Sequence, residues 1–183
     1  MPWSPRWSAH ARCSGWPVSD PNAAMGAVYQ ELLLDHYRRP RNRGDLPDAD
    51  ITVEQRNPLC GDTLRLQLEL DGDRLSAVAF TGQGCAISQA AASMMTQLIR
   101  GKTLTEASAL RERFRAMILG DAEAAADKSL GDMRALAGVA RLPVRVKCAL
   151  LAFSALEQAM DSVRRARPDP TAGNGKGETG NGN

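Results

Sequence analysis

The sequence predicts an α+β fold in which helices pack on one face of a small three-stranded antiparallel sheet. Three consecutive segments alternate apolar and polar residues, as strands with one buried face do. A helical pattern precedes them, and only helical patterns follow them. The chain has 183 residues and 43% hydrophobic content, which is enough for one buried core and too little for two.

The first element is expected to be a short helix over residues 28–37, where apolar side chains recur at helical spacing. Pro40 and Gly44 end this pattern. The strands are expected at residues 51–54, 64–70 and 75–80, with a turn at 71–73. Short connections between successive strands favour antiparallel pairing.

Four helical segments are expected after the strands, over residues 86–99, about 103–118, 122–137 and 143 to about 165. Thr103 or Thr105 can cap the second of these helices, and Glu106 completes a capping box with Thr103. Gly131 interrupts the third helix. Pro143 suits the first turn of the last one.

The two ends differ in composition from the middle of the chain. Residues 1–24 hold all three tryptophans and are interpreted either as a disordered N-terminal extension or as a mis-called start, with translation beginning at Met25. Residues 167–183 are rich in Gly and Asn and are expected to form a disordered tail. The folded domain is therefore expected over residues 25–166.

The composition argues against two classes of partner. The formal net charge is only +2, and the arginines are scattered, so nucleic acid is not expected as a partner. No stretch approaches the roughly 18 apolar residues of a membrane helix, and the N-terminus lacks the apolar region of a secretory signal. No membrane partner is expected, and the protein is expected in the cytoplasm, where free thiols and metal ligands are commoner than disulfides.

Three of the four cysteines lie in short motifs at the edges of the expected elements. The motifs are Asn57-Pro58-Leu59-Cys60-Gly61-Asp62, Gly82-Gln83-Gly84-Cys85-Ala86-Ile87-Ser88 and Arg145-Val146-Lys147-Cys148-Ala149-Leu150-Leu151. Cys13 belongs to none of them. Their spacings match no zinc-finger pair, so a shared site has to be assembled by the fold.

Cys60, Asp62, Cys85 and Cys148 are the candidate metal ligands. Zinc accepts thiolates and carboxylates in a tetrahedron, and three sulfurs with one oxygen form a suitable set. Gly61 permits a sharp bend, so that Cys60 and Asp62 can face one point. Cys85 precedes a helix, whose unpaired N–H groups favour a thiolate.

Basic side chains accompany the third cysteine. Arg145 lies one turn before Cys148 and Lys147 is adjacent to it, and both cations are expected to lower the pKa of the Cys148 thiol. His36, in the first helix, is expected to be a surface or partner-facing residue and not a ligand.

These motifs, together with residues 29–44, resemble the IscU/NifU N-terminal family of iron-sulfur cluster assembly proteins over residues 29–160. Within this family the chain is similar to the SufU branch. Lys147 stands where the scaffold branch has a histidine before its third cysteine, and residues 103–121 resemble the SufU insertion.

The resemblance implies a zinc site made by Cys60, Asp62, Cys85 and Cys148. It also implies a zinc-dependent sulfurtransferase that accepts persulfide sulfur from a SufS-type cysteine desulfurase, with downstream cluster scaffold proteins as further partners. Cys60 corresponds to the sulfur acceptor and Arg145 to a position that assists the partner reaction. Docking of the desulfurase is expected to supply a competing ligand and so release Cys60 as a nucleophile. Whether the protein is itself an enzyme or an acceptor and activator stays open.

A second function fits the same residues. The three thiolates and Asp62 could ligate a [2Fe-2S] cluster, which the protein would assemble and transfer as a scaffold. Lys147 and the insertion argue against this function. A purely structural zinc module is the third alternative, in which removal of the metal would only unfold the chain.

Overall fold

The computed structural model describes residues 21–166. Cys13, most of the segment predicted over residues 1–24 and the whole tail predicted over residues 167–183 lie outside the described residues. The elements are α1 (Pro21–Arg38), β1 (Ile51–Asn57), β2 (Asp62–Asp71), β3 (Arg74–Gln83), α2 (Ala86–Ile99), α3 (Leu104–Ile118), α4 (Ala122–Ala126), the 3₁₀-helix η1 (Lys128–Arg141) and α5 (Pro143–Ala166). The predicted α+β order is confirmed.

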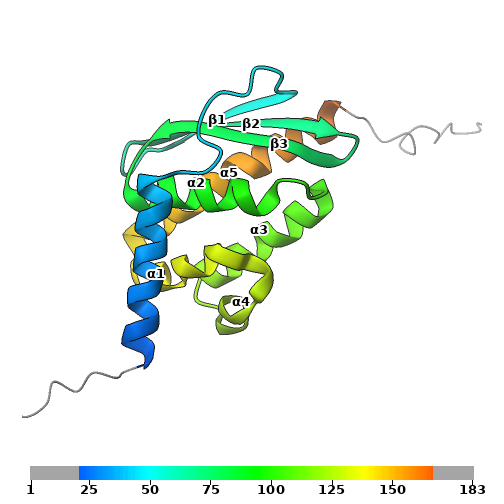
Figure 1. Ribbon diagram of the computed structural model, residues 1–183. Helices are drawn as coiled ribbons and strands as arrows, with labels where there is room; N and C mark the ends of the chain where they lie inside the picture. Colours follow the sequence, from blue (N-terminus) through cyan, green and yellow to red (C-terminus); the bar gives the residue numbers. More distant parts are fainter. Residues whose placement is uncertain (1–20, 167–183) are drawn as a thin grey trace, which may run out of the picture.

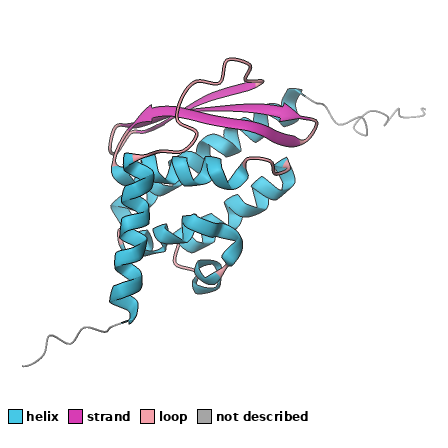
Figure 2. Ribbon diagram, viewed as in Figure 1, coloured by secondary structure: helices cyan, strands magenta, loops and turns pink. Residues whose placement is uncertain are grey.

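The three strands form one antiparallel sheet in the order β1-β2-β3. Figures 1 and 2 show α2 and α5 packed on the same face of this sheet. Alternate β2 side chains, Leu64, Leu66 and Leu68, point into this interface and are buried, which explains the apolar alternation in the sequence. The predicted three-stranded sheet with helices on one face is confirmed.

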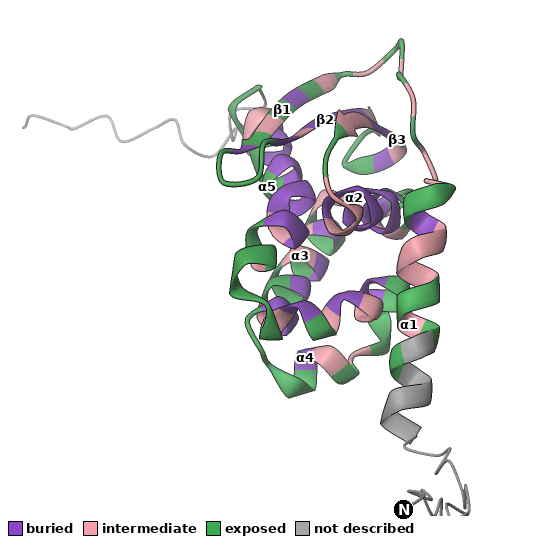
Figure 3. Cartoon of the chain, turned by 90° about the vertical axis from the view of Figure 1, so that its left-hand side faces the viewer, coloured by how far each residue is buried: buried purple, intermediate pink, exposed green. Residues whose placement is uncertain are grey.

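The remaining helices form a further layer beneath α2 and α5. Figure 3 shows α2 buried along most of its length, because the sheet covers one side of it and helices cover the other. α1 packs against α2 and η1, and α3 packs against η1 and α5. Among the described helices, none combines the length and apolarity needed to cross a lipid bilayer.

The segment after α3 departs from the single interrupted helix expected over residues 122–137. The break at Gly131 is confirmed, since its backbone has φ 50° and ψ −129°. An earlier break occurs at Asp127, which ends α4 and caps η1 by accepting a hydrogen bond from the Ser129 N–H at 2.9 Å. Aspartate competes with helical hydrogen bonding in this way, and the periodicity of the segment did not reveal it.

His36 is buried, with none of its surface exposed, so its prediction as a surface or partner-facing residue is wrong. Its Nδ1 lies 2.8 Å from the Ser93 hydroxyl of α2, and its Nε2 lies 3.3 Å from a carboxylate oxygen of Asp132 in η1. Burial is the largest influence on His36 and lowers its pKa. The residue therefore joins three helices as a neutral, hydrogen-bonded core histidine.

Thr103 caps α3, as one of the two sequence alternatives predicted. Its hydroxyl accepts a hydrogen bond from the Glu106 N–H at 3.2 Å, and its own N–H donates to the Glu106 carboxylate at 2.7 Å. Replacing Thr103 with alanine should lower the free energy of unfolding by about 1 kcal/mol, which corresponds to a fall in Tm of roughly 3 °C. Thermal unfolding measures this change, and an unaltered Tm would contradict the contribution of the cap.

Candidate metal centre

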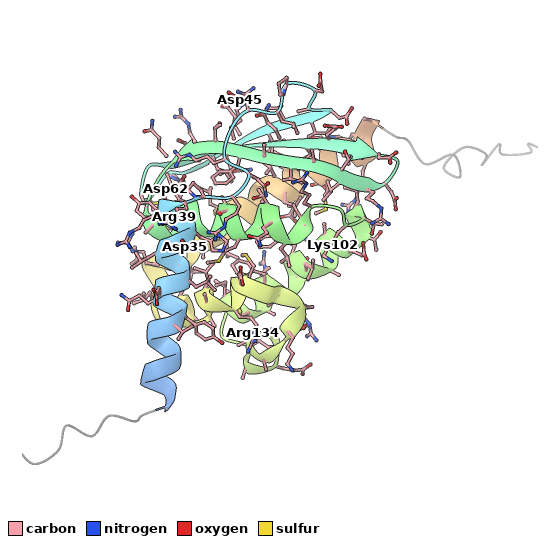
Figure 4. All side chains as sticks on the ribbon, viewed as in Figure 1. Asp35, Arg39, Asp45, Asp62, Lys102 and Arg134 are labelled. Carbon is pink, nitrogen blue, oxygen red and sulfur yellow. The ribbon has the colours of Figure 1, made fainter. Side chains whose placement is uncertain are left out.

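One end of the sheet presents a row of three residues to the face that the helices cover. Asn57 of β1 lies directly opposite Asp62 of β2. Because Thr63 pairs with Gln83, Gly84 comes opposite Asp62 on the other side. Asp62 is two residues from the buried Leu64 and therefore lies on the same face of β2, so the alternation that builds the core also points this carboxylate inward. Figure 4 labels Asp62 at this end of the sheet.

The Asp62 side chain is only 3% exposed. Its Oδ1 accepts a hydrogen bond from the Cys85 N–H at 3.1 Å, whereas its Oδ2 is buried without a hydrogen-bond partner among the described residues. Burial by itself raises the pKa of Asp62, but the nearby polar groups of Cys60, Ser88 and Cys85 together lower it below its ordinary value. Asp62 is therefore a buried carboxylate with one oxygen left for a further ligand.

The three motif cysteines converge on this carboxylate from separate elements. Cys60 is in the loop between β1 and β2, Cys85 is the N-cap of α2, and Cys148 is on the first half of α5. The Cys60 and Cys148 sulfurs are 3.3 Å apart, and ligand atoms of Cys60, Asp62 and Cys148 all lie within 4.8 Å of one another. The Cys85 sulfur falls outside that tightest group, although its backbone N–H binds Asp62. All three thiols are free.

Exposure separates the three cysteines. Cys60 is exposed, Cys85 is half-buried and Cys148 is 1% exposed. The pKa of Cys148 is raised to about 12, first by burial and then by its contacts with the Cys60 and Cys85 thiols. In the protein without a bound cation, the expectation that Arg145 and Lys147 lower the pKa of Cys148 is therefore wrong.

Neither Arg145 nor Lys147 is among the groups that shift the pKa of Cys148. Arg145 and Lys147 are both exposed, and neither forms an ion pair with a residue that the structure describes. Solvent screens charges at such positions. Both side chains are thus open to solvent, and neither offsets the burial that raises the pKa of Cys148.

Two glycines allow the close approach of strand and helix. A Cβ atom on Gly84 would lie 2.5 Å from the Ser88 Oγ and 2.8 Å from the Asp62 Cγ. Gly61 has φ +71°, the left-handed conformation in which glycine is favoured, and it closes the loop that carries Cys60. The predicted role of Gly61 as a bend between Cys60 and Asp62 agrees with this geometry.

Asn57 and Ser88 belong to the site and were not singled out from the sequence. The Asn57 Nδ2 lies 3.7 Å from the Cys148 sulfur, and the Ser88 hydroxyl donates to the Cys85 carbonyl oxygen at 3.0 Å. Both residues occur inside the cysteine motifs, one at the start of the first and the other at the end of the second. Asparagine before a turn and serine in the first turn of a helix are signals of local capping, and they could have marked both residues.

The residues present fit a bound cation of the kind predicted. Sulfur donors and one carboxylate suit a divalent ion such as zinc, and a cation would remove the cost of holding several thiols and a carboxylate together. The unpaired Asp62 Oδ2 also requires a partner, because a buried polar atom without one is destabilising. The same donors suit an iron-sulfur cluster, so the donor set alone does not distinguish the two.

The fold and this site define a class of protein: a small α+β domain whose exposed cysteine shares a centre with two further cysteines and a buried carboxylate. The chain belongs to the family described as the NifU-like N-terminal domain, which matches residues 28–166. The resemblance to the IscU/NifU family that the sequence motifs indicate is thereby confirmed.

Two curated relatives illustrate the similarity. A zinc-dependent sulfurtransferase SufU from Bacillus subtilis is 45% identical over 137 residues, which cover 75% of this chain and 92% of the relative. An iron-sulfur cluster assembly scaffold protein IscU from Streptococcus pyogenes is 42% identical over 143 residues, covering 78% of this chain and 89% of the relative. The similarity to a SufU protein supports the branch assignment made from Lys147 and the insertion.

Solved structures agree with the fold. One from Fervidobacterium islandicum, named as a cluster assembly scaffold for the SUF system, has a TM-score of 0.67 and 35% identity and covers 73% of this chain and 97% of its own. The N-terminal part of a NifU-like protein from Brucella abortus has a TM-score of 0.71 at 22% identity, covering 78% of this chain and 99% of its own. The second likeness concerns the fold alone.

Proposed function

We propose that this protein accepts sulfur from a SufS-type cysteine desulfurase and passes it on for iron-sulfur cluster assembly, with a zinc ion held by Cys60, Asp62, Cys85 and Cys148. The observation that carries this proposal is the exposed Cys60 sulfur 3.3 Å from the buried Cys148 sulfur, beside the unpaired oxygen of Asp62. Zinc, when bound, supplies the positive charge that lets these groups stay deprotonated together.

The four proposed ligands have different roles because their exposure differs. Asp62 and Cys148 are buried and fixed by backbone and side-chain neighbours, so they form the permanent part of the site. Cys60 is on an exposed loop and is the donor that a partner can reach. This difference favours Cys60 as the acceptor.

The transfer step balances without an external oxidant or reductant. The Cys60 thiolate attacks the outer sulfur of the desulfurase persulfide, and a new sulfur–sulfur bond forms on Cys60. The sulfur–sulfur bond of the desulfurase persulfide breaks, and its cysteine leaves as a thiolate. Cys60 then carries the persulfide that a downstream scaffold protein receives.

The docking surface for the desulfurase combines apolar and basic side chains around Cys60. Leu59 is 65% exposed, Leu142 just before α5 is 52% exposed, and Val144 in the first turn of α5 is 75% exposed. Arg145 follows Val144 in α5 and is also exposed. Exposed apolar residues rimmed by charge are typical of protein interfaces, and Arg145 is placed to contact the partner there.

Replacing Val144 with aspartate should weaken desulfurase binding roughly tenfold, because it puts a charge into an apolar contact. The matched control is Leu119→Asp, since Leu119 is 64% exposed at the end of α3, far along the chain from the cysteine motifs. Titration calorimetry with the desulfurase measures both variants. Equal weakening by the two substitutions would contradict the proposed docking surface.

The scaffold function is the second candidate, because the donor set also suits a [2Fe-2S] cluster and a relative named as a scaffold is 42% identical. Anaerobic reconstitution with iron and sulfide, followed by visible absorption, separates the two functions. A stable cluster at stoichiometric yield that passes to an acceptor protein favours the scaffold. Tightly held zinc together with a persulfide on Cys60 favours sulfur transfer.

The proposal extends to organisation and location. Residues 25–166 act as the functional domain and hold all four proposed ligands. The reducing cytoplasm is the proposed location, since the three thiols are free and a disulfide between two of them would remove the acceptor.

A further inference from the structure

Asn57 occupies the junction between the loop that carries Cys60 and the helix that carries Cys148. It is the last residue of β1, lies opposite Asp62 and is 4% exposed. A buried amide needs hydrogen-bond partners for both its oxygen and its nitrogen. The contacts that satisfy this amide are therefore informative about its role.

The oxygen atoms of Asn57 hold the Cys60 loop. The side-chain Oδ1 accepts a hydrogen bond from the Leu59 N–H at 3.1 Å, and the main-chain oxygen accepts one from the Gly61 N–H at 2.9 Å. These two bonds fix the residues immediately before and after Cys60. Asn57 thus positions the Cys60 sulfur by fixing the backbone on both sides of Cys60.

The nitrogen of the same amide faces α5. With Oδ1 engaged by Leu59, Nδ2 is directed toward Cys148 and donates to its sulfur at 3.7 Å. A hydrogen bond to sulfur stabilises negative charge on it, and neighbours of this kind tune metal–thiolate sites. The side-chain amide of Asn57 consequently contacts both the loop that carries Cys60 and the buried Cys148 thiol.

We propose that Asn57 is a positioning residue that holds Cys60 against Cys148, with its oxygen atoms on the Cys60 loop and its side-chain N–H on the Cys148 sulfur. Its contacts are separable: the loop can open by breaking the bonds from Leu59 and Gly61 while the bond to Cys148 persists. Asn57 thereby allows Cys60 to leave the centre without loss of the buried half of the site. The release of Cys60 for sulfur transfer rests on the proposed function. The placement of the Cys60 and Cys148 sulfurs rests only on the hydrogen bonds of Asn57.

Two substitutions test the nitrogen end of the amide, and Asn57→Ala tests the loss of the whole amide. Asn57→Ser keeps a short oxygen acceptor for the Leu59 N–H but has no donor that reaches Cys148. Asn57→Asp keeps the acceptor and directs a carboxylate oxygen at the sulfur. Thr103→Ala is the control, because it removes a hydrogen-bonded cap of α3 without altering any of the three cysteine motifs.

The first measurement is zinc affinity, obtained by competition with a chromogenic chelator at fixed pH. Asn57→Ser should lose about tenfold in affinity, as substitutions beside metal ligands do, and Asn57→Asp should lose more. Thr103→Ala should bind zinc as the unmodified protein does. An Asn57→Ser variant that is folded by circular dichroism and binds zinc as tightly as the unmodified protein would overturn the proposal.

The second measurement needs neither zinc nor a desulfurase. Diamide takes two electrons and two protons from a pair of thiols, and peptide mass mapping gives the rate at which Cys60 and Cys148 of the metal-free protein become linked. Asn57→Ala should form this disulfide several-fold more slowly, because the loop is no longer held near α5. An unchanged rate overturns the positioning role even if the proposed function holds, and a slowed rate supports it even if sulfur transfer fails.

Discussion

If the proposed function holds, replacing Cys60 with alanine should abolish the stimulation of a SufS-type cysteine desulfurase. The expected loss is complete because the alanine side chain has no sulfur to attack the desulfurase persulfide. Cys85 and Cys148 should not substitute for Cys60, since Cys85 is half-buried and Cys148 is 1% exposed. The measurement is alanine production by the desulfurase with and without the variant.

The matched control is Cys13→Ala, which removes a cysteine outside the three motifs and should leave stimulation unchanged. Calorimetric titration of the Cys60→Ala protein with the desulfurase separates loss of docking from loss of chemistry, and binding should persist. Stimulated turnover in the Cys60→Ala variant would falsify the assignment of Cys60 as acceptor.

Replacing Gly84 with alanine should produce the second large effect, a loss of zinc affinity of about 10–100-fold. The added Cβ would lie 2.8 Å from the Asp62 Cγ and 2.9 Å from its Oδ1, closer than such atoms can approach. Asp62 has little room to yield, because it is 3% exposed and Oδ1 is bonded to the Cys85 N–H. The carboxylate should therefore turn away from the three sulfurs.

Gly138→Ala supplies the control, since a Cβ at that position in η1 meets no atom within 4 Å. It adds the same methyl group and should leave zinc affinity unchanged. Elemental analysis of the purified variants and chelator competition give the comparison. If Gly84→Ala retains full zinc affinity, Asp62 is not a ligand and the proposed site consists of sulfur donors without it.

Most of the fold follows from patterns within short windows. The alternation in residues 64–70 predicted β2 because one face of that strand packs on α5. The Thr103 and Glu106 pair predicted the start of α3, since a capping box involves neighbours in sequence. Asp127 was missed as a break because its side chain competes with the helix in a segment whose periodicity still appears helical.

The sequence by itself singled out the residues to which the chemistry is assigned in the proposed function: three cysteines and one aspartate at the ends of elements, in the motifs that resemble the family. It also determined that Asp62 lies on the same face of β2 as the buried leucines. Only the tertiary structure decided that His36 is buried, that Arg145 and Lys147 leave the Cys148 thiol unaffected, and that Asn57 joins the Cys60 loop to α5. Burial and solvent screening depend on which elements pack together in three dimensions, and contacts between residues as far apart as Asn57 and Cys148 have no local signature.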